Sequence, residues 1–172
     1  MRFFVVLCAL GLLSSCSQQQ ETADLASEEA ALSKRVENYH AAIAKAYRGV
    51  SIDTDSLINE YFAPDVYYVT YWGTSEPIDT TKRRIRSALG NLRDYQSRIE
   101  NLTVKAYHNS GYAFFIQRQS YTLFGQLMDE YLPTTWVLEK RDGVWKVVHA
   151  QRSADIQTIT QLMEAAQRRQ RQ

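Results

Sequence analysis

Apolar residues recur every three or four positions between Glu28 and Arg48, which is the spacing of one face of an α-helix. The residues of this stripe are Leu32, Val36, Tyr39, Ile43 and Tyr47. Gly49 follows at the place where glycine commonly ends a helix. The pattern therefore predicts a long amphipathic helix, with its apolar face turned toward a core.

After Gly49 the pattern alternates between short helices and strands. A second, short helix starts at residue 53 or 54 and stops before Pro64, and a third is capped by Asp79 or Thr80. The predicted strands cover residues 66–72, 97–108, 112–124, 128–140 and 144–152, and the third and last helices cover residues 81–92 and 155–167. Short turns join the last four strands, so these strands are predicted to be antiparallel neighbours.

The closing hairpin, Thr134–Ser153, has Asp142-Gly143 at its tip, a pair typical of two-residue turns with positive φ. A regular ladder from that turn places Trp136 opposite His149. The core face then carries Thr134, Trp136, Leu138, Trp145, Val147, His149 and Gln151. The outer face carries Thr135, Val137, Glu139, Lys146, Val148, Ala150 and Arg152.

Helices first, then a strand, a helix and four antiparallel strands predict an α+β fold, with a curved, mostly antiparallel sheet wrapped on N-terminal helices. From Glu28 to Ser153 the chain resembles the nuclear transport factor 2-like superfamily and its SnoaL-like domains. The resemblance rests on the long helix, on Phe62–Val66, on Ala113–Phe115 and above all on Arg141–His149. It implies a cone-shaped sheet with a pocket at its open end.

The N-terminus has the pattern of a secretory signal peptide. Arg2 precedes an apolar run, Phe3–Leu13, and small residues follow it. The run is too short for a membrane-spanning helix, which needs about 20 residues. We therefore expect residues 1–15 to be removed as a signal peptide.

Leu13-Ser14-Ser15-Cys16 resembles the bacterial lipobox, in which the cysteine is lipidated and becomes the first residue. The alternative is an ordinary signal peptide followed by an incidental cysteine. With lipidation, residues 16–27 form a lipidated cysteine and a polar tether, residues 28–153 the SnoaL-like domain and residues 154–172 a C-terminal helix. Ser17 after Cys16 resembles the pattern of proteins on the periplasmic face of the outer membrane.

Composition excludes several classes of site. Without Arg2 the 20 basic residues become 19, equal to the 19 acidic residues, which argues against nucleic-acid binding. Cys8 leaves with the signal and Cys16 carries lipid, so no cysteine remains for a disulfide or a metal. The three histidines fall on different elements, and the chain has no phosphate or dinucleotide motif, so we expect no metal and no cofactor.

The candidate site lies where the core face of the closing hairpin enters the pocket implied by the resemblance. The predicted ligand-binding residues are Trp136, His149, Gln151, Tyr61, Tyr71 and Trp72. Such a set suits a small apolar molecule held by burial and a few hydrogen bonds. The alternative for His149 is a hydrogen-bonded core residue. The facing of Tyr71 and Trp72 and the register of Asp129 and Glu130 stay open.

Two functions follow from this site. The first is a lipid-anchored, non-catalytic module that binds a small ligand or an envelope protein. The alternative is a SnoaL-like isomerase, cyclase or hydrolase that uses His149 for acid–base chemistry. A homodimer is a further expectation, built on the outer sheet face with Thr135, Val137, Val148 and Ala150.

Overall fold

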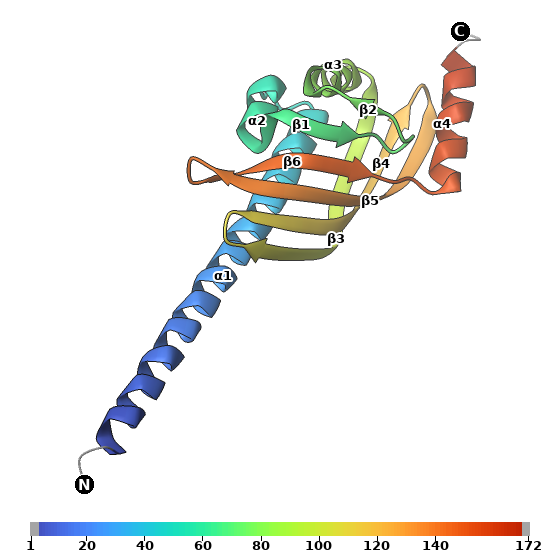
Figure 1. The fold of residues 1–172 in the computed structure, drawn as a ribbon. Helices are drawn as coiled ribbons and strands as arrows, with labels where there is room; N and C mark the ends of the chain where they lie inside the picture. Colours follow the sequence, from blue (N-terminus) through green and yellow to red (C-terminus); the bar gives the residue numbers. More distant parts are fainter. Residues whose placement is uncertain (1–3, 170–172) are drawn as a thin grey trace.

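The computed structural model describes residues 4–169, with side chains described from residue 24 to residue 168. This part of the chain forms four helices and one sheet of six strands (Figure 1). The helices are α1 (Phe4–Tyr47), α2 (Thr54–Tyr61), α3 (Ile78–Leu89) and α4 (Ile156–Arg169). The strands are β1 (Phe62–Val69), β2 (Ser75–Glu76), β3 (Leu92–Tyr107), β4 (Ser110–Leu123), β5 (Gln126–Arg141) and β6 (Val144–Arg152).

The strands lie in the order β2-β1-β6-β5-β4-β3. β1 and β6 are parallel, and the other neighbouring strands are antiparallel. Side chains from one face of the sheet form the larger core cluster with α1, α2 and α3, and a smaller cluster joins the sheet to α1 and α4. This arrangement confirms the predicted α+β fold with a curved, mostly antiparallel sheet on helices.

The apolar stripe of α1 packs as predicted. Leu32 and Val36 are fully buried, and Tyr39 and Ile43 are each 4% exposed. The helix begins at Phe4, earlier than the predicted Glu28, so the segment predicted as a tether is helical. Among the described residues no helix is long and apolar enough to cross a membrane. The side chains of the predicted signal peptide and of the predicted lipid-bearing cysteine lie outside the described part of the chain.

Trp136 lies at the centre of the core. Its ring stacks on His40 at 5.4 Å and contacts the rings of Tyr39, Phe62 and Phe115 edge-on at 5.3–5.4 Å. Aromatic pairs in such geometries add to the free energy gained by burial. The core therefore joins α1 to β1, β4 and β5.

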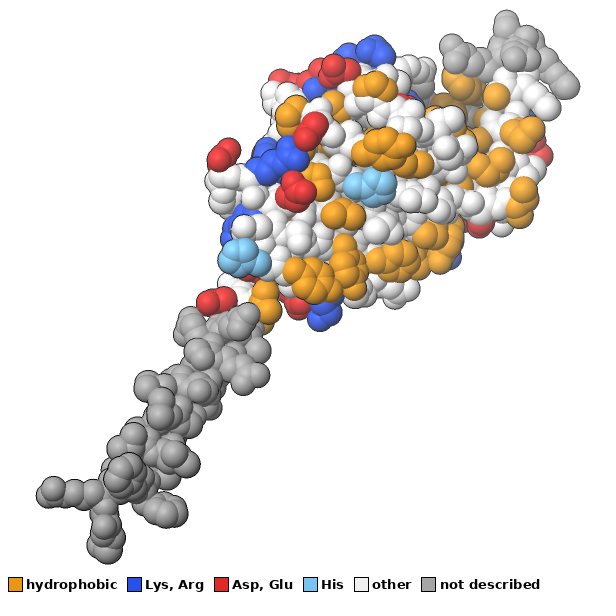
Figure 2. Space-filling model, in the orientation of Figure 1, with side chains coloured by type: hydrophobic (Ala, Val, Ile, Leu, Met, Phe, Trp, Pro, Cys, Tyr) orange, Lys and Arg blue, Asp and Glu red, His pale blue; other side chains and the backbone are white. Residues whose placement is uncertain are grey.

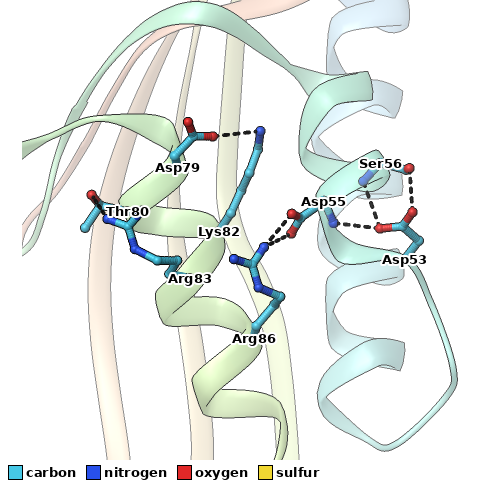
Figure 3. A network of polar contacts seen from close by, with 8 residues as sticks. All are labelled: Asp53, Asp55, Ser56, Asp79, Thr80, Lys82, Arg83 and Arg86. Atoms are coloured by element: carbon cyan, nitrogen blue, oxygen red, sulfur yellow. Dashed lines mark hydrogen bonds and ion pairs between the residues drawn. The ribbon is translucent and has the colours of Figure 1, made fainter.

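Polar contacts fix α2 and α3 beside one another (Figure 3). The helix α2 begins where predicted, and Asp53 caps it, because its carboxylate accepts the backbone N–H groups of Asp55 and Ser56 at 3.0 and 3.1 Å. Asp55 also pairs with Arg86 of α3. This exposed ion pair contributes little stability, on the order of 0–1 kcal/mol, but it joins the two helices.

The start of α3 differs from the prediction. Pro77 is the N-cap, and its carbonyl accepts the N–H of Thr80 at 2.9 Å. Asp79 instead accepts a hydrogen bond from Lys82 at 3.1 Å, and Thr80 accepts one from Arg83 at 2.9 Å (Figure 3). Proline suits this place because it has no N–H to leave unpaired at the start of the helix. The predicted caps are therefore wrong by two or three residues.

The turn of the closing hairpin is as predicted, and both Asp142 (φ 51°) and Gly143 (φ 75°) have positive φ. The ladder also follows the prediction at first, with Leu138 opposite Val147. The indole N–H of Trp145 donates to Glu28 at 2.9 Å and so ties the hairpin to α1.

Beyond Leu138 the predicted register is wrong. A β-bulge at Val148 places Val137 opposite His149 and Trp136 opposite Ala150. Each residue of β6 after the bulge therefore faces the side opposite to the predicted one. Ala150 is fully buried, and its small side chain leaves room for the indole of Trp136.

Candidate functional site

A cavity of about 390 Å³ lies between the inner face of the sheet and helices α1, α3 and α4. Tyr47 of α1, Ile85 of α3 and Leu162 of α4 belong to its walls. Gln119 of β4 and Arg152 of β6 supply polar groups from the sheet. Its size is in the range of small-molecule sites, and its walls mix apolar residues with a few polar groups, as such sites do.

The polar groups face the cavity because side chains alternate along a strand. Gln117, Gln119 and Tyr121 follow one another on one face of β4, and all three line the cavity. Glu130 of β5 is the direct partner of Gln119 in the ladder and lies beside it. One hairpin thus brings four polar side chains together.

A hydrogen-bond network organises this group around Glu130, which is only 1% exposed. The hydroxyl of Tyr121 donates to Oε1 of Glu130 at 2.5 Å, and the amide of Gln119 donates to Oε2. The oxygen of Gln119 accepts hydrogen bonds from Tyr95 at 2.9 Å and from Gln117 at 2.7 Å. Burial raises the pKa of Glu130, and the hydrogen bonds from Tyr121 and Gln119 and the charge of Arg152 oppose that shift.

Arg152 brings a positive charge to the cavity. Its Nε is buried and has no hydrogen-bond partner among the described residues. Burial acts to lower the pKa of its guanidinium, but the surrounding tyrosine oxygens, Tyr68 and Tyr39 first, keep that pKa above its ordinary value. The guanidinium therefore stays charged.

Tyrosines form much of the remaining wall. Burial raises the pKa of Tyr39, Tyr47, Tyr71 and Tyr95 above the ordinary value, so these hydroxyls stay neutral. A neutral phenol can donate one hydrogen bond and accept others. The wall can therefore hold a flat apolar body and bind polar groups at its edge.

Arg84 of α3 stands in the cavity wall beside Trp72. Its guanidinium donates to Glu76 at 2.9 Å and lies 5.1 Å from the ring centre of Trp72 and 5.8 Å from that of Tyr68. Thr81 donates to the same carboxylate at 2.6 Å. The charge of Arg84 is thus already paired, in contrast to that of Arg152.

Of the six residues predicted to bind a ligand, Tyr71 lines the cavity. Trp72 contacts Tyr71 edge-on at 4.5 Å and stands beside the cavity wall. Trp136 is a core residue, 1% exposed. Tyr61 packs under Arg35, whose guanidinium lies 4.1 Å from the ring centre of Tyr61.

The bulge moves the other two predicted residues, His149 and Gln151, to the outer face of the sheet. His149 stacks on Tyr67 at 5.7 Å there, and neither His149 nor Gln151 belongs to the cavity walls. The predicted place of His149 beside Trp136 in a pocket is therefore wrong. Figure 2 shows hydrophobic side chains gathered over the sheet on the face that it displays.

Sequence reasoning missed the polar centre of the site. Glu130, Gln119 and Tyr121 could have been placed together by extending the ladder of β4 and β5, because they alternate along paired strands. Arg152 could not have been placed in the cavity from the sequence, because only the bulge turns its side chain inward. In the described part of the chain no three His, Cys, Asp or Glu side chains cluster as metal ligands do.

Comparison with known proteins shows the fold. No family model matches the chain, and no curated protein matches it. Several solved structures, in contrast, match the chain. A nuclear transport factor 2-like protein from Pseudomonas putida KT2440 is 18% identical with a TM-score of 0.61, over 78% of this chain and 92% of that one.

A second nuclear transport factor 2-like protein, from Pseudomonas aeruginosa, is 21% identical with a TM-score of 0.61, over 71% of this chain and 96% of its own. A protein with a cystatin-like fold from Nostoc punctiforme is 13% identical with a TM-score of 0.55, over 71% of this chain and 90% of its own. Both are described as proteins of unknown function. The chain therefore has the nuclear transport factor 2-like, or cystatin-like, fold, and at these identities the likeness extends to fold alone.

Proposed function

We propose that the protein is a non-catalytic module that binds a small molecule in the cavity between the sheet, α1, α3 and α4. The cavity itself carries this proposal, because it combines a volume of about 390 Å³ with tyrosine and aliphatic walls. Binding is favoured over catalysis because both oxygens of Glu130 already accept hydrogen bonds, from Tyr121 and Gln119. His149, the acid–base group predicted from the sequence, lies on the outer face of the sheet.

A neutral fluorescent probe, N-phenyl-1-naphthylamine, tests the proposal. The wild-type chain should bind it saturably with a stoichiometry of about one, by fluorescence titration. Ala88 lines the cavity, so Ala88→Phe should fill part of it and weaken binding about 10-fold or more. Ala41→Phe makes the same change on an exposed part of α1 and should leave binding unchanged. Absence of saturable binding, or equal binding by Ala88→Phe, would refute the proposal.

The second candidate is an acid–base enzyme, now with Glu130 as its proton-transfer group. One observation favours it: burial raises the pKa of this carboxyl inside the cavity. The probe reaction is exchange of the acidic C–H protons of cyclohex-2-enone in deuterated buffer, followed by NMR. An enzyme should lose this exchange in Glu130→Gln, and equal rates in the two proteins would exclude the role for this probe.

We further propose that the chain is exported and anchored in the cell envelope through lipid on Cys16, on the periplasmic face of the outer membrane. The sequence around Cys16 supports this proposal. In bacteria grown with labelled palmitate, Cys16→Ser should lose both the label and membrane association. Cys8→Ser, inside the predicted signal peptide, is the matched control and should keep both. Label on Cys16→Ser would contradict the proposal.

We also propose a homodimer that pairs through the outer face of the sheet. Exposed side chains there, Tyr67, Tyr112, Phe114 and Val137, are 36–57% exposed, so a second copy would cover a substantial apolar area. Val137 and Thr135 keep their expected place on this face, whereas Ala150 faces the core.

A further inference from the structure

We infer that the ligand is a small monocarboxylate with a flat apolar body, and that its carboxylate binds the guanidinium of Arg152. This inference rests on the proposed binding function and specifies its ligand. It starts from the half-buried side chain of Arg152, whose buried Nε has no hydrogen-bond partner within the described part of the chain.

The side chain of Arg152 has no protein partner for its charge. Arg152 lines the cavity and is half-buried, its Nε is fully buried, and no hydrogen bond or ion pair to its side chain is found among residues 24–168. Buried charges in proteins are normally paired, because an unpaired charge in an apolar surrounding is costly. Arginine cannot escape this cost by losing its proton. A ligand that brings a negative charge would remove the cost.

The protein's own acidic groups do not supply that charge. Glu130 shares the cavity, but no ion pair within 4.0 Å joins it to Arg152, and its oxygens are engaged by Tyr121 and Gln119. Glu76 is engaged by Arg84 and Thr81. The charge of Arg152 acts to lower the pKa of Glu130, but no carboxylate of the described residues forms an ion pair with the guanidinium, and the tyrosines around it are neutral.

The charges also limit the kind of anion. Arg152 is the single cation of the cavity wall without a partner in the described residues, since Arg84 is paired with Glu76. One guanidinium matches one carboxylate, which it binds with two parallel hydrogen bonds. A doubly charged phosphate would leave one negative charge unpaired beside Glu130. The tyrosine wall suits a flat ring, and the volume of about 390 Å³ suits a small molecule.

A matched pair of probes tests the inference on the full chain: 2-naphthoate and 2-naphthamide, which differ in charge and hardly in shape. By calorimetric titration the wild type should bind the acid about 10-fold or more tightly than the amide, as a charged hydrogen bond predicts. Arg152→Met should bind both equally. Arg83→Met, an exposed arginine of α3 outside the cavity wall, should keep the wild-type ratio.

The outcomes separate this inference from the proposed function. If N-phenyl-1-naphthylamine binds and the two naphthyl probes bind equally to the wild type, the cavity binds ligands and the role of Arg152 is refuted. If the neutral dye does not bind either, the proposed function itself fails. Preference for the acid in Arg152→Met would also overturn the inference. If Arg152→Met does not fold, Arg152→Lys is used, and its preference should fall below that of the wild type because lysine lacks the planar fork.

Discussion

At the scale of single residues, His40 is a buried histidine that the core holds in its neutral form. Burial first, and then the charge of Arg152, lower the pKa of His40 to about 3. Its Nε2 has no hydrogen-bond partner among the described residues. The unfolded chain takes up a proton at about pH 6.5, whereas the folded chain does so only near pH 3.

Acid should therefore destabilise the protein through His40. The unfolded state binds more protons between about pH 6.5 and pH 3, so stability falls in this window as pH falls, by about 1.4 kcal/mol per pH unit. His40→Phe removes this contribution. When the pH falls from 7 to 4.5, the free energy of unfolding of the wild type should fall by about 2–3 kcal/mol more than that of His40→Phe. Urea denaturation at the two pH values measures this, with the exposed His108→Asn as control, and parallel curves would contradict it.

Gly111 is a second residue whose identity the packing explains. A Cβ placed there would lie 2.6 Å from Cδ1 of Leu32 and 2.7 Å from the carbonyl oxygen of Lys105. The carbonyl belongs to β3 and cannot yield easily. Gly111→Ala should therefore destabilise the protein by about 1–3 kcal/mol.

Gly90 provides the matched control for this prediction. Apart from its two chain neighbours, no atom of the described residues lies within 4 Å of a Cβ built there, and its φ of −82° suits any residue. Gly90→Ala should leave stability unchanged or raise it by up to about 1 kcal/mol. Midpoints of urea denaturation compare the two variants. Equal midpoints would show that the sheet absorbs the extra methyl group.

At the scale of elements, local patterns predicted what local physics decides. The stripe of α1 is set by the period of the helix, and the tip of the closing hairpin by the positive φ that Asp142-Gly143 tolerates. The bulge at Val148 has no such local signal. The bulge is favoured by packing between β5 and β6, because it brings the small Ala150, and not His149, to the inner face beside Trp136. Each face assigned beyond it was therefore reversed.

The difference between local patterns and contacts between strands also explains how much of the site could be predicted. The position of Tyr71 in the cavity agrees with the set expected from sequence. Glu130 and Gln119 meet only because two long strands keep their register over many residues. Arg152 faces inward only because of the bulge. The register between distant strands thus determines which polar side chains face the cavity. The sequence alone predicts that a pocket exists and that its walls are aromatic.

Disulfide formation can test the bulge directly. In the structure Thr135 lies opposite Gln151, both on the outer face, whereas a regular ladder would pair Thr135 with Ala150. In a background without Cys8 and Cys16, the pair Thr135→Cys and Gln151→Cys should oxidise readily, because directly opposed residues bring their Cβ atoms close enough. Thr135→Cys with Ala150→Cys should keep free thiols, since Ala150 points inward. Thiol titration after mild oxidation measures the result. If the pair at positions 135 and 150 oxidised and the pair at 135 and 151 did not, the regular register would be correct and the bulge would be refuted.

At the scale of the whole molecule, the sheet separates two surfaces with different properties. Its inner face closes on α1, α3 and α4 around the cavity. α4 belongs to this closure, since Thr158 accepts the N–H of Tyr131 at 3.4 Å and Ala165 is buried beside Met128. The C-terminal helix thus docks on its own domain. The outer face stays available for a partner.

The outer face presents a continuous row of side chains that the proposed dimer would cover. Tyr67, His149, Val137 and Tyr112 are consecutive partners across β1, β6, β5 and β4. Val137 is central in this row and 37% exposed. In a symmetric dimer the same patch meets itself, so one added charge appears twice at the interface, in a place where like charges repel.

Val137→Glu should therefore shift the protein toward the monomer. In a Cys16→Ser background, which removes the lipid, the parent should show a mass that rises from monomer to dimer over micromolar concentrations, by sedimentation equilibrium. Val137→Glu should weaken this association about 10-fold or more. Ile156→Glu, at an 81% exposed apolar residue of α4, is the control and should behave as the parent. A parent that stays monomeric at all concentrations would show that the outer face does not pair. An equal loss of association with Ile156→Glu would contradict the proposal too, because a charge at Val137 should act specifically only if Val137 lies in the interface.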